Sequence, residues 1–247
     1  MKLTILGTSA AFAGKDDGCP SYLLICNGKN YLIETGPGCM STLQKYISYR
    51  ELSGIFLSHL HADHVSELYT LRYAVYVAQR DGHMKKPLSI YMPKSPRQVF
   101  KFIRTTIKNE FDIHEISDDV KLNLEELSIS FLKTIHPVSA YAMRFEQGLK
   151  TLVYTSDSAY FDTLRHFCKD ASLLLSEATL QNIDRQFEQQ GHMTAETAGR
   201  LARDSGARKL VLTHIWPEYD KNVSLKEARM TFNGEIVIAK RGQIFSI

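Results

Sequence analysis

The fold and the chemistry of this chain are indicated most strongly by the stretch Gly54-Ile55-Phe56-Leu57-Ser58-His59-Leu60-His61-Ala62-Asp63-His64. Its first half is a short apolar run, typical of a buried strand. Four metal-ligand side chains then fall within six residues: His59, His61, Asp63 and His64. Imidazole and carboxylate together suit zinc, manganese or iron. The chain has only nine histidines, so chance rarely places four such residues in one hexapeptide.

The spacing of these four residues indicates more than one metal position. His59 and His61 are two residues apart, so in an extended turn both side chains point the same way. Asp63 and His64 stand where a helix is expected to begin, and we expect their side chains to diverge there. The segment can therefore supply ligands to two metal ions.

This His-x-His-x-Asp-His pattern after a strand resembles the metallo-β-lactamase superfamily of metal-dependent hydrolases. The family's further motifs follow in order over nearly the whole chain, each at the end of an apolar strand, at His136, Asp157 and His214. The resemblance implies two divalent metal ions as cofactors. We expect zinc first, with manganese or iron as alternatives that these ligands also accept.

The resemblance also assigns the ligands to the two ions. One metal would be held by His59, His61 and His136. The other would be held by Asp63, His64 and His214, and Asp157 would bridge the two. The family commonly has Asp where this chain has Glu34. Such a carboxylate usually supports the ligands from behind, and we expect Glu34 to do so here.

Two later segments are similar to ribonuclease Z and its phosphodiesterase relatives. They are Gln190-Gly191-His192-Met193-Thr194 and Ser176-Glu177-Ala178-Thr179, where the relatives have His at the first place. The resemblance implies that Glu177 orients His192, and that His192 acts as a general acid on the leaving oxygen of a phosphodiester. With Asp63, these two residues form the expected catalytic set.

The substrate is expected to be a small cyclic or short-chain nucleotide, attacked by a metal-bound hydroxide. His136 and Asp157 are only 21 residues apart, and most of that length is a predicted hairpin. No room remains there for the arm with which ribonuclease Z grips tRNA, so long nucleic acid is not the expected partner. The alternatives are a thioester or lactone hydrolase on the same site, ribonuclease Z-like RNA processing without the arm, and a non-enzymatic binding module.

The pattern of short apolar runs and helical periods predicts a mixed α/β (α+β) protein. The resemblance implies a four-layer αββα sandwich, as a single domain over residues 1–247. The expected strands are Lys2–Leu6, Ser21–Cys26, Tyr31–Glu34, Gly54–Ser58, Leu88–Met92, Glu126–Lys133, Ala140–Glu146, Thr151–Thr155, Ser172–Ser176, Lys209–Thr213 and Glu235–Ala239, with a last strand pair turning at Arg241-Gly242. The expected helices are Met40–Tyr49, His64–Arg80, Pro96–Asn109, Ala159–Cys168, Thr194–Ser205 and Leu225–Thr231.

Composition, targeting segments and cysteine spacing indicate where in the cell the protein is expected. Hydrophobic residues make up 44% and charged residues 23% of the chain, which is ordinary for a soluble globular protein. We find neither a signal peptide nor a membrane span, and the spacing of the four cysteines suggests reduced thiols in a cytoplasmic protein.

Relatives often dimerise, so a homodimer is considered. Tyr69, Tyr73 and Tyr76 share a helix face, for which core or dimer packing is favoured over base stacking.

Overall fold

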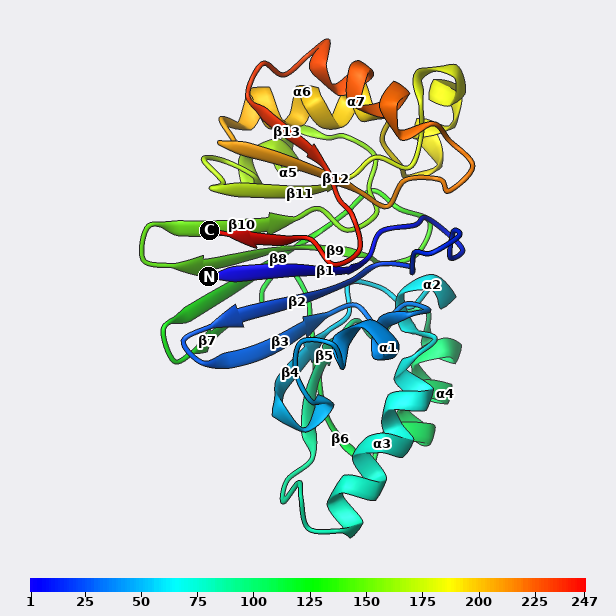
Figure 1. Ribbon diagram of the computed structural model, residues 1–247, viewed down its shortest axis with the longest axis vertical. Coiled ribbons are helices and arrows are strands. Elements are labelled where there is room, and N and C mark those ends of the chain that lie inside the picture. Colours follow the sequence, from blue (N-terminus) through cyan, green and yellow to red (C-terminus); the bar gives the residue numbers. More distant parts are fainter. The chain divides into compact units, whose positions relative to one another are not determined.

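The computed structural model describes all residues from 1 to 247, and their contacts divide the chain into two compact units. Unit 1 comprises Met1–Ile116 and Lys240–Ser246, and unit 2 comprises Ser117–Ala239 with Ile247. Each unit contains one seven-stranded sheet and its own helices, as Figure 1 shows. A mixed α/β chain with two sheets was expected. The single domain over 1–247 stays a prediction.

The sheet of unit 1 has the order β14-β1-β2-β3-β4-β5-β6. The last strand of the chain pairs antiparallel with the first, so the red and the blue strand lie side by side in Figure 1. From β3 to β6 the neighbours are parallel. The strands are β1 Lys2–Gly7, β2 Ser21–Cys26, β3 Lys29–Ile33, β4 Leu52–Phe56, β5 Leu88–Met92, β6 Phe111–Glu115 and β14 Ile244–Ser246.

Helices of unit 1 cover one face of this sheet. Leu71 and Val75 of the third helix and Ile103 of the fourth join a buried apolar cluster with strand residues such as Leu32 and Ile55. This burial removes apolar area from water and is the main force that fixes the helices on the sheet. The helices are α1 Cys39–Leu43, the 3₁₀ turn η1 Tyr49–Glu51, α2 Ala62–Val65, α3 Leu68–Arg80 and α4 Arg97–Ile107.

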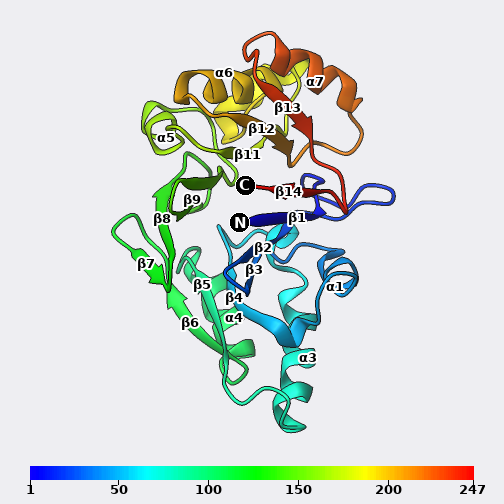
Figure 2. The same ribbon diagram turned by 60° about the vertical axis from the view of Figure 1, so that its left-hand side comes forward.

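The sheet of unit 2 has the order β13-β12-β11-β10-β9-β8-β7. Its parallel half, β10 to β13, brings the carboxyl ends of neighbouring strands to one edge. Figure 2 shows its helices gathered beside β11, β12 and β13. The elements are β7 Lys121–Leu124, β8 Leu127–Lys133, β9 Tyr141–Gln147, β10 Lys150–Tyr154, α5 Asp162–Phe167, β11 Leu173–Glu177, η2 Asn182–Gln190, α6 Ala195–Ser205, β12 Lys209–Thr213, α7 Lys221–Arg229 and β13 Glu235–Ile238.

Several predicted elements differ from the observed ones. Strands β6 and β7 were not predicted. The expected pair of strands turning at Arg241-Gly242 is wrong, because β13 belongs to the sheet of unit 2 and β14 to that of unit 1. The helix expected over Met40–Tyr49 ends at Leu43. The helix expected over His64–Arg80 is divided into α2 and α3.

The tyrosines of α3 do not all pack into the core. Tyr69 is partly buried against the apolar cluster of unit 1. Tyr73 and Tyr76 are 64% and 48% exposed, so core packing is wrong for these two. No helix in the structure combines the length and the hydropathy that crossing a membrane requires.

Candidate metal centre and catalytic residues

The four ligand candidates of unit 1 converge at the end of β4. His59 Nε2 and His61 Nδ1 lie 3.2 Å apart, so these two side chains meet as their spacing predicts. Asp63 Oδ2 lies 3.4 Å from His64 Nε2, and the His59 and His64 rings are 4.0 Å apart. The expected divergence of Asp63 and His64 is therefore wrong. Both lie in the single short turn of α2, where the carboxylate reaches back to the ring.

Glu34 lies directly behind this cluster. Its carboxylate accepts a hydrogen bond from the Ser58 N–H at 3.1 Å, and its Oε1 lies 3.5 Å from His64 Nδ1. The side chain is fully buried, and this burial raises the pKa of Glu34 above its ordinary value, although the facing His64 opposes the shift. Ser58 also reaches His59, with its hydroxyl 3.0 Å from His59 Nδ1. Sequence reasoning gave Ser58 no role.

The turn that follows β3 packs against the segment that contains the ligand candidates Asp63 and His64. Thr35 donates its N–H to the His64 carbonyl at 2.7 Å. A Cβ on Gly36 would lie 2.1 Å from the Asp63 carbonyl oxygen, so only glycine fits there. The backbone of the turn is thus packed directly against α2.

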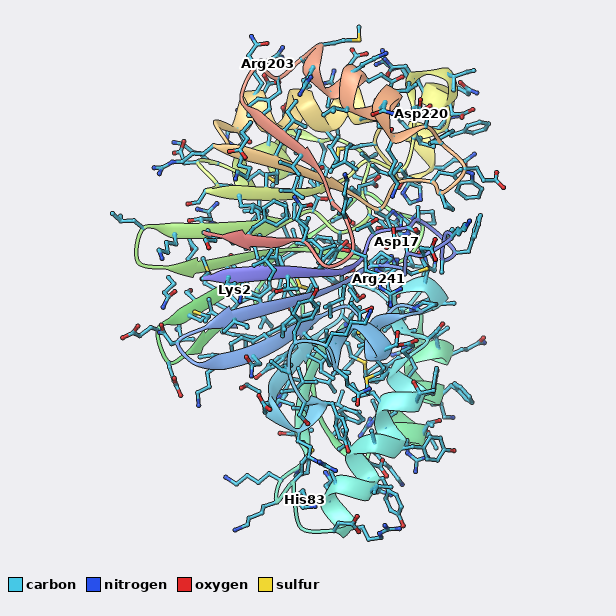
Figure 3. The ribbon with its side chains drawn as sticks, viewed as in Figure 1. Lys2, Asp17, His83, Arg203, Asp220 and Arg241 are labelled. Atoms are coloured by element: carbon cyan, nitrogen blue, oxygen red, sulfur yellow. The ribbon has the colours of Figure 1, made fainter.

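The loop between β1 and β2 also contacts a ligand candidate. Ala11 donates its N–H to Asp63 Oδ2 at 3.2 Å. Within the loop, Asp17 accepts hydrogen bonds from the hydroxyls of Thr8 and Ser9 at 2.5 and 3.1 Å. Figure 3 labels Asp17 on this loop and His83 beyond the far end of α3.

In unit 2, the ligand candidates follow the ends of three strands. His136 follows β8, Asp157 follows β10 and His214 follows β12. Asp157 Oδ1 lies 3.5 Å from His214 Nδ1. His136 Nδ1 donates to the Gly191 carbonyl at 3.2 Å, so Nε2 is the ring nitrogen that could bind a metal. One ligand atom each from His136, Asp157 and His192 lies within 4.8 Å of the others.

Glu177 and His192, the two residues expected from the sequence to act as a catalytic pair, lie in contact. His192 Nδ1 lies 3.1 Å from Glu177 Oε1. Glu177 is fully buried and also accepts from the N–H groups of Ser158, Thr179 and Met193, at 2.9, 3.0 and 3.2 Å. A carboxylate held by three backbone donors has little freedom to move. It therefore holds the ring of His192 at Nδ1.

Thr179 joins this pair to the last ligand candidate. Its Oγ1 lies 2.8 Å from His214 Nδ1 and 3.3 Å from His192 Nδ1. Sequence reasoning quoted Thr179 as part of a motif without giving it a role. Because one hydroxyl contacts both rings, the orientation of each ring restricts that of the other.

Three residues among or beside the candidate side chains, one in unit 1 and two in unit 2, adopt a left-handed backbone conformation that non-glycine residues rarely use. They are Glu34, Ser156 and His214, with φ angles of 61°, 54° and 51°. Each follows the last residue of a strand by one or two positions. Such conformations concentrate at functional sites, where the surrounding structure holds them in place.

The donor set of each unit fits a divalent transition metal. Unit 1 presents three imidazoles and one carboxylate, and unit 2 presents imidazoles with the carboxylate of Asp157. Several of these side chains are fully or almost fully buried, among them His59, His64, Asp157 and His214. Buried imidazoles that face each other or carboxylates are typical of metal sites, in which each ligand is braced by a further hydrogen bond.

Comparison with known proteins agrees with this geometry. A family model described as a beta-lactamase superfamily domain matches residues 29–215. The probable metallo-hydrolase YhfI of Bacillus subtilis is 36% identical over 246 residues, which is 99% of both chains. Its crystal structure, described as a metallo-beta-lactamase fold protein, superposes with a TM-score of 0.90 at 34% identity, covering 99% of this chain and 98% of the other.

More distant relatives carry names from nucleic-acid and phosphate chemistry. Ribonuclease Z of Archaeoglobus fulgidus is 23% identical, covering 96% of this chain and 94% of its own. A diphosphatase from the PhnP family superposes with a TM-score of 0.78 at 19% identity, covering 100% of this chain and 97% of that one. The resemblance inferred from the motifs is confirmed: the chain belongs to the beta-lactamase superfamily and has the metallo-β-lactamase fold.

Proposed function

We propose that this protein is a dinuclear metal-dependent phosphodiesterase that acts on a small cyclic or short-chain nucleotide. The observation that supports this best is the pair of the buried Glu177 and the partly buried His192, 3.1 Å apart, in a chain of a metallo-hydrolase family. A phosphodiester needs a proton for its leaving alkoxide, and an imidazole held by a carboxylate can supply it.

The metal assignment follows the family pattern. One ion would be held by His59, His61 and His136, the other by Asp63, His64 and His214, with Asp157 bridging. When bound, two such ions make water nucleophilic near neutral pH and neutralise charge that develops on phosphorus. We propose zinc first, with manganese or iron as alternatives.

The protein's own groups then have separate tasks. Asp63 would help to orient the attacking water, because its carboxylate is itself held by the Ala11 N–H. His192 would donate from Nε2 to the leaving oxygen while Glu177 holds Nδ1. Glu34 would keep His64 in place from behind.

A small substrate is favoured over tRNA by the segment between His136 and Asp157. That segment is occupied by the hairpin of β9 and β10, whose turn consists of Gly148 and Leu149. The ribonuclease Z relative is named for RNA processing and the PhnP-family structure for a diphosphatase. Both names concern phosphate esters or anhydrides. Long nucleic acid therefore stays outside the proposal, and a homodimer and a cytoplasmic location stay predictions.

The test is a substrate panel on protein whose metal content is measured in the same sample. We expect about two ions per chain, hydrolysis of 2′,3′- and 3′,5′-cyclic nucleotides or dinucleotides, and loss of that activity in His192→Ala with the metal content unchanged. Two bound ions with turnover of thioesters or lactones, and none of phosphodiesters, would overturn the proposal in favour of a carbonyl-ester hydrolase. A protein that binds no metal would point to a binding module.

A further inference from the structure

Unit 1 has a groove that takes no part in the chemistry described above. It lies between α4 and β6 and has a volume of about 400 Å³. Phe100, Phe111 and Ile113 provide apolar surface in it, while Arg104 and Lys108 line it from the helix. None of these residues is a candidate ligand or catalytic group.

One wall of this groove is an unpaired sheet edge. β6 is the terminal strand of its sheet and pairs only with β5. Glu110 accepts from Leu88 of the β5 side, and Ile116 donates to Met92. Because the groups of a strand alternate between its two edges, the N–H and C=O groups of Phe111 and Ile113 point away from β5. Such an edge can pair with a further strand.

The other wall carries unbalanced positive charge. Residues 97–108 contain four cationic side chains, at 97, 101, 104 and 108, and no acidic residue. These spacings of four and three place all four on one face of the helix. Two acidic residues of β6 also line the groove: Glu115 lies 2.5 Å from Lys94, and Asp112 lies 3.1 Å from His114, which is charged only when protonated. The groove is thus lined by three cations and two carboxylates, and the exposed Arg104 and Lys108 supply its excess of positive charge.

We propose that this groove binds an extended, acidic peptide segment of a partner protein, which adds to β6 as a further strand and lies along α4. Backbone hydrogen bonds to the edge would provide affinity, as in other cases of strand addition. Because successive side chains of a strand point to opposite faces of the sheet, the acidic side chains of the added strand would face Arg104 and Lys108 on α4, and the apolar ones would lie on the opposite face. A second copy of this chain fits less well, because pairing of β6 with another β6 would bring two cationic α4 helices together.

The probe is a fluorescein-labelled heptapeptide in which valine and glutamate alternate, and the readout is fluorescence anisotropy with full-length protein. We expect saturable binding that Arg104→Glu with Lys108→Glu weakens by about ten-fold. The matched control reverses two exposed cations on another helix, Lys226→Glu with Arg229→Glu, and should change the affinity by less than about two-fold. Equal losses in both double variants would overturn the proposal.

The peptide backbone supplies an independent test that needs no protein variant. In a strand, every second N–H points to the same edge. Methylating the amides of the valines in one peptide, and those of the glutamates in another, should abolish binding of one peptide and spare the other. Equal behaviour of the two, or no binding of the parent peptide, would contradict strand addition.

Other occupants would give different results. A dimer in sedimentation that excludes the peptide would assign the groove to a second copy. A single-stranded oligonucleotide that competes with the peptide and binds more tightly would assign the cationic face of α4 to nucleic acid. Either result would overturn the proposal.

Discussion

At the scale of single residues, Glu177 is the carboxylate on which the proposed proton transfer depends. Glu177→Gln keeps the size of the side chain but removes the negative charge that faces His192. We expect kcat on a cyclic nucleotide to fall by about 10²-fold, with two metal ions still bound, as measured by elemental analysis. Loss of metal along with activity would instead make Glu177 part of the ligand set.

Gly191 tests how closely the loop before His192 is packed. It has a φ of +99°, and a Cβ there would lie 2.8 Å from His136 Cα. Gly191→Ala should therefore displace His136 and weaken metal binding, measured by competition with a chromophoric chelator. The control is Gly148→Ala, at a φ of +56° with nothing within 4 Å. Both variants should lose about 1 kcal/mol of stability, but only the first should lose metal affinity. Equal metal affinity in the two would contradict this account of the loop.

We expect all four cysteines to react slowly with thiol reagents, as structural thiols do and catalytic thiols do not. All four are free and buried, and burial raises the pKa of Cys19 to about 12. A thiol reacts as its thiolate, so a raised pKa slows reaction near neutral pH. We expect none of the four to react rapidly with Ellman's reagent at pH 8 until denaturant is added. Rapid reaction of one thiol in the folded protein would show a reactive cysteine that this structure does not account for.

At the scale of elements, Thr194 begins the helix that follows the catalytic loop. Its hydroxyl accepts from the Thr197 N–H at 3.2 Å, and the N–H and hydroxyl of Thr194 both donate to Glu188 at 2.9 Å. Thr194→Ala removes this cap and should lower the free energy of unfolding by about 1 kcal/mol, as measured by urea denaturation. An unchanged midpoint would mean that the cap adds nothing to the packing of α6.

Continuous apolar runs were predicted well and polar strands were not. The bounds of β2 and β5 agree with the sequence pattern, because nearly every residue in them is apolar or buried. β6 and β7, with the sequences FDIHE and KLNL, alternate apolar and polar residues over only four positions each, and most of their residues are at least partly exposed. The sequence prediction missed this short alternation, which is the pattern of a half-buried strand.

The division of the helix after the ligands has a tertiary cause. The Glu67 N–H donates to the Thr35 carbonyl, and its carboxylate accepts from the N–H groups of Gly38 and Met40. These contacts replace the hydrogen bonds that would have continued α2 into α3. A sequence window cannot contain them, because the partners lie about 30 residues away.

The candidate residues, unlike the bounds of several elements, could be chosen from the sequence alone. The seven proposed ligands and His192 lie in short motifs whose residue types indicate metal binding and proton transfer. The groups that hold these candidate residues in place could not be chosen from the sequence, because their contacts exist only in the folded chain. They are Ser58, Thr179 and the backbone of Ala11 and Gly191.

At the scale of the whole molecule, metal binding should stabilise the complete chain. The proposed ligands come from both units, so a bound pair of ions would link their unfolding, and ligands that bind only the folded state raise its stability. We expect one cooperative thermal transition for the metal-loaded protein, and a lower Tm after treatment with a chelator, which zinc restores. Two transitions with metal bound would contradict both the shared site and the single domain over 1–247.

In the proposed mechanism, His192 protonates the leaving oxygen of a phosphodiester at a dinuclear metal site. The most direct measurement compares kcat/KM of wild type and His192→Ala on two substrates at equal metal occupancy. One is bis(p-nitrophenyl) phosphate, whose leaving group departs without a proton, and the other is a cyclic nucleotide, whose alkoxide needs one. We expect the loss of kcat/KM in His192→Ala to be at least about 10²-fold larger for the cyclic nucleotide. Equal losses on both substrates, or turnover of neither, would contradict this mechanism.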